Sequence, residues 1–158
     1  MADSKMLKEK LASGEFDARL KEVYLSDKAV EDQKKRDAEI IDEFVRLFGD
    51  NDSIELFSAP GRTEVQITGH TDHNHGKVLA ASVDLDTVAA AAKRDDGIIV
   101  EKSFKFDALE VDISDLEVHT EEFGKSSGLI RGMCSGFKER GYNIGGFKAA
   151  SMSRGLSG

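Results

Sequence analysis

Residues 57–90 read FSAPGRTEVQITGHTDHNHGKVLAASVDLDTVAA and are the most informative part of the chain. They contain the only proline, Pro60, which directly precedes Gly61 and Arg62. They also hold three of the four histidines, at positions 70, 73 and 75. Such a concentration of polar side chains between two apolar segments has three interpretations: a metal site, a charged surface turn, or part of a pocket for a polar ligand.

A metal site would use imidazole and carboxylate groups that suit zinc or nickel. The candidate ligands are His70, Asp72, His73 and His75. The helical spacing of two histidines four residues apart is absent, and the glycines at 69 and 76 indicate a loop. A closed site would need further ligands, for which His119 and Cys134 are the remaining histidine and cysteine. The ligand count therefore does not favour a metal.

A hydrophilic turn between two strands is the simplest interpretation, because such residues are common in turns. A ligand pocket is the third. The carboxylate of Asp72 can accept hydrogen bonds from two sugar hydroxyls, and the imidazole of His70 can donate or accept one. Arg62 would add a fixed positive fork for phosphoryl oxygens. From the residues alone, the turn and the pocket both remain open.

Upstream of this stretch, the first fifty residues are predicted to be helical. Helices are expected over Lys5–Ser13, Phe16–Leu25 and Asp27–Phe48, the last with Ser26 as N-cap and Gly49 just past its end.

The longest predicted helix has one apolar stripe and one solvated face. Its stripe contains Ile40, Ile41, Phe44, Val45 and Phe48. Two i,i+4 pairs, Glu31 with Lys35 and Asp32 with Arg36, are expected on the solvated face.

The hydrophobic period then changes to that of strands. A strand at 54–58 is expected to stop at Ala59-Pro60-Gly61. Residues 78–92 are interpreted as a strand in which apolar residues at 83, 85, 87, 89 and 91 alternate with Asp84 and Asp86. Asp95-Asp96-Gly97 is typical of a hairpin turn into a strand at 98–100.

The remaining third of the chain is predicted to hold an extended segment, a helix and a strand. The segment 105–119 is extended, and residues 120–140 are helical. Phe123, Ser127, Ile130, Met133, Cys134 and Phe137 are expected to share one helix face. The strand IGGFKAAS at 144–151 leads into the loop SRGLSG at 153–158. The order of elements predicts an α+β domain.

Composition excludes several classes of function. The net charge is −8, and the basic residues are interspersed with acids, so no basic stripe is available for a nucleic acid. No apolar run is long enough to span a membrane. The first 17 residues lack the apolar block of a signal peptide. With Cys134 as the single cysteine, no internal disulfide can form, and a cytoplasmic location is expected.

The motif at 57–90 resembles the N-terminal signature of galactokinases, members of the GHMP kinase superfamily. The family pattern is approximately A-P-G-R-x-[NE]-x-x-G-x-H-T-D-[YH]-x-x-G-x-V-L. Residues 128–158, GLIRGMCSGFKERGYNIGGFKAASMSRGLSG, resemble the family's helix and strand that lead into its phosphate loop, G-x-G-L-S-S-S-A. The segment DLEVHTEEFGKSS at 115–127 and the helical N-terminus are similar to bacterial galactokinases as well.

The resemblance implies an ATP-dependent kinase, with Mg-ATP as donor, that phosphorylates galactose at its anomeric hydroxyl. Arg62 matches the catalytic arginine placed near the transferred phosphoryl group. His70 and Asp72 match residues that hold the sugar hydroxyls. Gly155 and Ser157 match the phosphate loop, whose backbone amides would bind ATP oxygens at a helix N-terminus. No structural metal is implied.

The sequence departs from the family pattern in three places. Seven residues separate Arg62 from His70, one more than is usual, and Gly69 stands where the family has glutamate or asparagine. The phosphate loop lacks its first glycine and its serine run. The chain ends within that loop, so the catalytic aspartate and the C-terminal half have no counterpart in it.

The expected organisation is one partial N-terminal GHMP kinase domain over residues 1–158, incomplete on its C-terminal side. It comprises a helical segment at 1–50, the sheet and sugar-site motif at 54–104, and the helix, strand and truncated phosphate loop at 120–158. Little turnover is expected from this chain alone. The alternatives are a non-catalytic sugar-binding or association module, or a metal-binding module. A bare apolar face at Phe147, Ala149 and Met152 predicts self-association or a C-terminal kinase half as partner.

Overall fold

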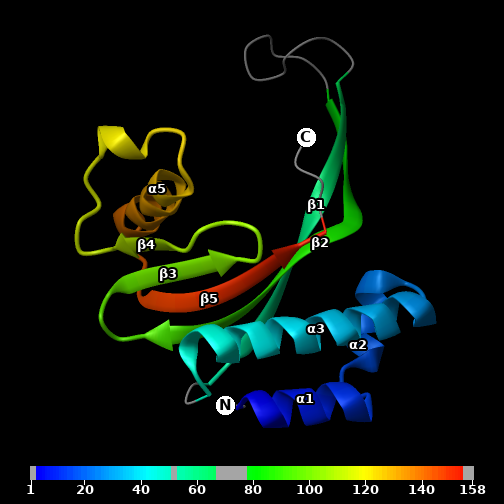
Figure 1. Ribbon diagram of the computed structural model, residues 1–158. Helices are drawn as coiled ribbons and strands as arrows, with labels where there is room; N and C mark the ends of the chain where they lie inside the picture. The colour runs from blue at the N-terminus through cyan, green and yellow to red at the C-terminus, as the bar shows by residue number, and fades with distance from the viewer. Residues whose placement is uncertain (1–2, 51–52, 67–77, 155–158) are drawn as a thin grey trace.

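The computed structural model describes residues 3–50, 53–66 and 78–154 (Figure 1). In chain order the elements are α1 (Ser4–Ser13), α2 (Asp17–Tyr24), α3 (Asp27–Phe48), β1 (Glu55–Gln66), β2 (Val78–Arg94), β3 (Ile98–Ser103), β4 (Leu109–Asp112), the 3₁₀ turn η1 (Thr120–Glu122), α5 (Ser126–Glu139) and β5 (Gly146–Ser153). The predicted α+β class with a helical N-terminal segment is confirmed.

Helix α3 has the boundaries that the sequence predicts. The Ser26 hydroxyl accepts a hydrogen bond from the Ala29 amide at 3.2 Å, which satisfies a free N–H of the first turn. At the other end the Gly49 amide donates to the Val45 carbonyl at 2.8 Å. The side chains of Ile40, Ile41 and Phe44 on the predicted stripe are all 0% exposed.

The five strands form one sheet in the order β1-β2-β5-β3-β4, in which β3 and β5 are parallel and the other neighbours antiparallel. The prediction of a hairpin across Asp95-Asp96-Gly97 is therefore wrong. The turn is present, but β5 lies between β2 and β3 and bonds to both. A turn fixes where two strands begin and end, whereas pairing depends on which strand completes the ladder.

Strand β1 does not stop at Ala59-Pro60-Gly61 but continues to Gln66. The register against β2 shifts between Pro60 and Arg62. Proline is tolerated here because β1 is an edge strand and the position is a bulge, where a missing N–H removes no required ladder bond.

The buried face of β2 is the opposite of the predicted one. Val88, Ala90 and Ala92 are at most 5% exposed, whereas Leu85, on the expected apolar face, is 47% exposed. Asp86 lies on the buried face and is 3% exposed. Strand β2 alternates between its two faces as predicted. Its inward face carries the acidic Asp86, which in the sequence is typical of a solvent-exposed face.

Two hydrophobic clusters lie on opposite sides of the sheet. Helix α3 packs on β2 and β5, and α1 packs against α3, as Figure 1 shows. This cluster contains Leu7, Leu11, Ile40, Ile41, Phe44, Ile54, Val88, Ala90, Ala92 and Ala150. The second contains Ile99, Val111 and Ile113, which Ile130 and Cys134 of α5 help to cover. The sheet is thus covered at different places by helices from the two ends of the chain.

Helix α5 differs from its prediction at both its start and its face. It begins at Ser126, because residues 120–122 form the separate turn η1. Only Ile130 and Cys134 of the predicted face pack on the sheet, while Met133 and Phe137 are 51% and 54% exposed. The apolar stripe of α5 is wider than the area over which the helix contacts the sheet, so part of the stripe is exposed.

The apolar face expected at Phe147, Ala149 and Met152 is not bare. Ala149 is 4% exposed, Met152 packs against the cluster under α3, and Phe147 packs against the cluster under α5. None of the helices in the described part of the chain has the length and apolar composition that a membrane span requires.

Both i,i+4 pairs predicted on α3 are wrong. Lys34 forms an ion pair with Glu31 at 3.1 Å, and Lys35 lies 4.0 Å from Asp32, so both contacts have i,i+3 spacing. Arg36 is turned inward, is 3% exposed, and pairs with Asp86 of β2. Spacing along a helix allowed the surface pair, but an inward carboxylate on the neighbouring sheet attracts the guanidinium more strongly in a less polar environment.

Candidate functional site

The APGR motif, which is residues 59–62, lies at the irregular part of the β1–β2 ladder. Pro60 faces Asp86 and Arg62 faces Ser82, so two steps along β1 correspond to four along β2. This difference bulges β2 opposite Gly61. The side chain of Arg62 is exposed at this bulge. A bulge re-aims side chains relative to a regular strand, which makes it a suitable position for a functional arginine.

Gly61 is required where the two strands come close. A Cβ atom at this position would lie 2.6 Å from the Leu85 carbonyl oxygen and 3.3 Å from Cγ2 of Val83. The first distance is shorter than any van der Waals contact, and the atom it meets belongs to the backbone. The close approach therefore explains why glycine precedes Arg62.

Four of the five predicted site residues lie outside the described residues. These are His70, Asp72, Gly155 and Ser157. The predicted convergence of Arg62 with His70 and Asp72 consequently stays a prediction. The strands that lead to these residues are described, because Gln66 pairs with Val78 on either side of the histidine motif. Strand β5 ends at Ser153, two residues before Gly155.

A buried carboxylate, Asp86, lies beside the APGR bulge and accepts hydrogen bonds from three elements. Nη1 of Arg36 on α3 donates to its Oδ1. The Tyr24 hydroxyl at the end of α2 donates to its Oδ2. The Ser58 hydroxyl on β1 donates to the same Oδ2 at 2.7 Å. One side chain thus connects two helices to the strand that carries Arg62.

The guanidinium of Arg36 extends this network to the end of β5. Its Nη2 donates to the backbone carbonyl of Asp86 at 2.9 Å and to that of Met152 at 2.8 Å. The Arg154 amide donates to the same Asp86 carbonyl at 2.9 Å. Nε of Arg36 is buried and has no partner among the described residues. The result is a buried ion pair at the point where β5 leaves the sheet.

The network determines which of its groups are charged. Burial would raise the pKa of Asp86, but hydrogen bonds from Arg36, Tyr24 and Ser58 outweigh it, so this pKa lies below its ordinary value. Burial, together with the hydrogen bond to Asp86, raises the pKa of Tyr24 to about 12. At neutral pH the site therefore contains an ionised carboxylate, a guanidinium and a neutral phenol.

A second carboxylate, Asp37, lies beside the pair and has a different environment. It is 7% exposed, and its Oδ1 accepts a hydrogen bond from Nε2 of Gln33 at 2.6 Å. Burial raises its pKa to about 6, against the opposing effects of the Gln33 hydrogen bond and the charge of Arg36. Burial thus destabilises the ionised form of Asp37, whereas hydrogen bonds stabilise the ionised form of Asp86.

These groups form the floor of a cavity of about 680 Å³ between α2 and the β1–β2 bulge. Tyr24, Gln33, Asp37 and Asp86 line it on the buried side, and Ser58, Pro60 and Ser82 belong to the two strands. The floor is polar and carries a net negative charge, whereas α2 contributes the apolar side chains of Leu20 and Val23. The cavity borders the APGR motif without including Arg62.

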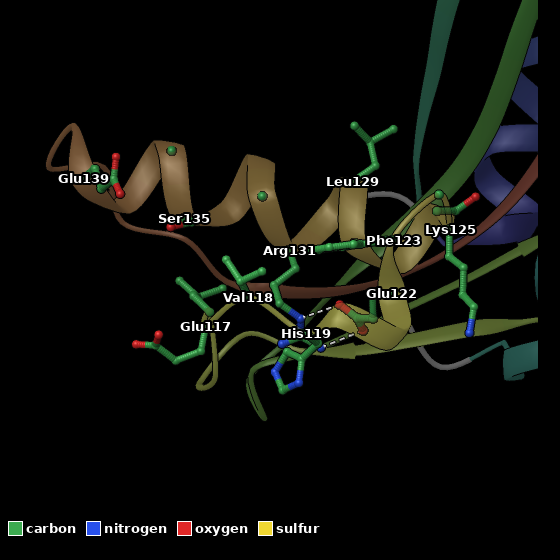
Figure 2. A pocket seen from close by; sticks show the side chains of 16 residues that line it. Glu117, Val118, His119, Glu122, Phe123, Lys125, Leu129, Arg131, Ser135 and Glu139 are labelled. Carbon is green, nitrogen blue, oxygen red and sulfur yellow. Dashed lines mark hydrogen bonds and ion pairs between the residues drawn. The ribbon is translucent and has the colours of Figure 1, made fainter.

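A separate cavity of about 690 Å³ lies between residues 116–125 and α5 (Figure 2). Arg131 on α5 donates from Nε to Glu122 at 2.8 Å, and Figure 2 shows this pair across the cavity. His119 lies 2.9 Å from Asp115. Arg131 and His119 thus already have acidic partners, while Glu117, Lys125 and Glu139 also line this cavity.

Sequence reasoning missed Arg36 and Asp86. The signal that could have found them is spacing: Arg36 stands four residues before Ile40 and eight before Phe44, on the same side of the helix as these buried residues. Asp86 stands two residues before Val88, on the same side of the strand. A buried cation and a buried anion on packed faces predict each other.

A metal centre finds no support in the described part of the chain. There, no three histidine, cysteine, aspartate or glutamate side chains come together as a set of ligands. Cys134 is a free thiol whose pKa is raised by burial, which makes it a poorer ligand and nucleophile. The histidine cluster itself lies outside the described residues.

Comparison with known families and curated proteins gives a consistent result. Residues 42–93 match the family model of the galactokinase galactose-binding signature. The galactokinase of Lactococcus lactis subsp. cremoris is 33% identical over 108 residues, which are 66% of this chain and 26% of that protein. The Bacillus subtilis galactokinase is 31% identical over 104 residues, again covering 26% of its length.

A solved structure gives the same relationship in three dimensions. The crystal structure of Lactococcus lactis galactokinase complexed with galactose superimposes with a TM-score of 0.63 and 30% identity, over 77% of this chain and 31% of that one. The resemblance to galactokinases is therefore confirmed, and so is the fold that it implied. The chain spans about a quarter of the length of the curated relatives that it matches.

Proposed function

Because this chain is a relative of the galactokinases, we propose that it carries the galactose-binding motif of a galactokinase-type, ATP-dependent sugar kinase. The reaction of the whole protein would transfer the terminal phosphoryl group of Mg-ATP to the anomeric hydroxyl of galactose. The single observation that carries this proposal is the match of residues 42–93 to the galactose-binding signature.

Each residue of the motif has a role that suits its chemistry. We assign recognition of the sugar hydroxyls to His70 and Asp72, since a carboxylate accepts two such hydrogen bonds and an imidazole can donate or accept one. Arg62 would stabilise the charge that develops on the migrating phosphoryl group, which a planar guanidinium does through paired N–H donors. Its exposed position at the bulge supports this role, because a substrate must reach it.

The nucleotide would be bound near the end of β5. Backbone amides at Gly155 and Ser157 are the proposed donors to ATP phosphates, as in other glycine-containing loops. Magnesium would neutralise phosphate charge. Since no three metal-binding side chains come together among the described residues, we assign no magnesium ligand to them. Positioning and electrostatics dominate phosphoryl transfer, and the matched relatives are about four times longer than the aligned part. We therefore propose sugar binding, rather than turnover, as the property to measure.

Isothermal titration of the full chain with galactose tests the proposal, with glucose, ATP and zinc titrated in parallel. We expect binding of galactose that is lost in His70→Ala and Asp72→Ala. His119→Ala is the matched control, because His119 is the one histidine outside the motif, and it should bind galactose like the wild type. Zinc binding without galactose binding would contradict the proposal and favour a metal-binding module.

A further inference from the structure

Asp86 is a buried acid at the end of the apolar part of a strand face, and stability alone does not explain its presence. The residues that follow it on this face, Val88, Ala90 and Ala92, are all buried. A buried ion pair must lose the hydration of both charges, and replacing it by apolar side chains of similar volume is often neutral or stabilising. The pair formed by Arg36 and Asp86 therefore calls for an explanation other than stability.

The connections of the pair suggest what that explanation is. The Asp86 carboxylate accepts the Ser58 hydroxyl at 2.7 Å, four residues before Arg62 on the same strand. The Asp86 carbonyl accepts the Arg154 amide at 2.9 Å, one residue before Gly155. The two segments that bear the proposed phosphoryl-binding and nucleotide-binding residues are thus attached to a single residue.

Arg36 makes this connection rigid from a third side. Its Nη2 bridges the carbonyls of Asp86 and Met152, at 2.9 and 2.8 Å, so β2 and β5 are held together at the end of their ladder. Along the chain, Ser58 is 28 residues from Asp86, and Met152 is 116 residues from Arg36. A guanidinium suits this role because its fork of donors is fixed in one plane.

We propose that Arg36 and Asp86 are positioning residues that set the geometry of the Arg62 segment relative to the strand end at residues 152–154. The proposal rests on the proposed function, since it names the residues that would hold the two substrate segments of that site in register. Neither residue touches the substrates. Their effect reaches the site through Ser58 and through the backbone of β5.

The test separates positioning from simple support of the fold. In the double variant Arg36→Met with Asp86→Leu, apolar side chains replace the pair, and the chain is expected to stay folded. Positioning predicts that this folded variant binds ATP at least about tenfold more weakly, the effect of losing one well-placed hydrogen bond to the phosphates. Amide NMR shifts should change both at residues 59–62 and at 152–154. Circular dichroism verifies that each variant is folded at the temperature of titration.

A second set of variants keeps the proposal falsifiable if the double variant does not fold. Ser58→Ala removes the hydroxyl by which the Arg62 strand contacts both Asp86, at 2.7 Å, and the Tyr24 hydroxyl, at 3.2 Å, and we expect weaker ATP binding. Ser58→Thr retains the hydroxyl and should restore the affinity. Ser103→Ala is the matched control, because Ser103 is a serine of β3, a strand of the same sheet that does not pair with the strand of Asp86, and its ATP affinity should equal that of the wild type.

The outcomes distinguish this proposal from the proposed function. Weaker ATP binding by folded Ser58→Ala, with normal ATP binding by Ser58→Thr and Ser103→Ala, supports positioning. Unchanged affinity in Ser58→Ala or in the folded double variant overturns positioning and leaves the proposed function standing. A wild-type chain that binds no galactose overturns the proposed function. A wild-type chain that binds galactose but no ATP overturns the role of the pair, because the end of β5 would then not be a substrate segment.

Discussion

Replacing Asp37 by asparagine should make the protein more stable at neutral and alkaline pH, and this effect should vanish in acid. Asparagine has nearly the same shape, and its Oδ1 can still accept the hydrogen bond from Nε2 of Gln33, which Asp37 accepts at 2.6 Å. What changes is the charge. Asp37 is 7% exposed, so its ionised form lacks most of its hydration.

The magnitude follows from the pKa of Asp37, which burial raises from 3.8 to about 6. One pKa unit corresponds to about 1.36 kcal/mol, so the full shift is worth about 3 kcal/mol. Because the folded-state pKa lies above the unfolded value, the unfolded chain loses this proton first. The stabilisation from protonated Asp37 is present below the unfolded value of 3.8 and is lost as the pH rises through about 6.

Urea unfolding of wild type and Asp37→Asn between about pH 4 and pH 8 measures this difference. We expect equal stability at the acid end and an advantage of about 2–3 kcal/mol for the variant at the alkaline end. Glu39→Gln is the control, because Glu39 is exposed on the same helix, and it should not change the pH dependence. A stability difference that is constant with pH, or a variant that is less stable at about pH 8, would refute the reasoning.

Three further substitutions test the packing around the site and the core. Gly61→Ala places a Cβ 2.6 Å from the Leu85 carbonyl oxygen and should cost about 2 kcal/mol in a urea titration; an unchanged midpoint would mean that the strands separate freely at the bulge. Ile40→Ala, at a side chain that is 0% exposed, should lower stability by about 3 kcal/mol with an unchanged denaturant slope. Gly132→Ala meets nothing within 4 Å on α5 and should raise the melting temperature, since alanine favours a helix by about 1 kcal/mol over glycine; a lower melting temperature would show that the glycine has a packing role.

Local features of the chain could be predicted because their causes are local. The cap at Ser26, the C-terminal Gly49 and the stripe through Ile40 and Phe44 are set by residues within a few positions of one another. Helix α3 therefore has its predicted boundaries. The alternation along 78–92 and the turn at 95–97 were recognised for the same reason.

Pairing across the sheet could not be predicted in this way. The turn at Asp95–Gly97 has a hairpin sequence, yet β5 enters between the strands that it joins. Strand β1 continues through Pro60 because its position at the edge of the sheet spares the missing N–H. Both results depend on the order of the strands in the sheet, which is set by contacts between segments that are distant in the sequence.

For the candidate site, the sequence by itself determined the motif, its resemblance to galactokinases and the residue types that would bind a sugar and a phosphoryl group. Only the tertiary structure decided that Arg36 turns inward to Asp86, and that this carboxylate connects the APGR strand with the end of β5. The physical reason is that Asp32 and Asp86 were both available to Arg36. The choice between them depends on burial, which strengthens an ion pair between charges that are close in space and 50 residues apart in the chain.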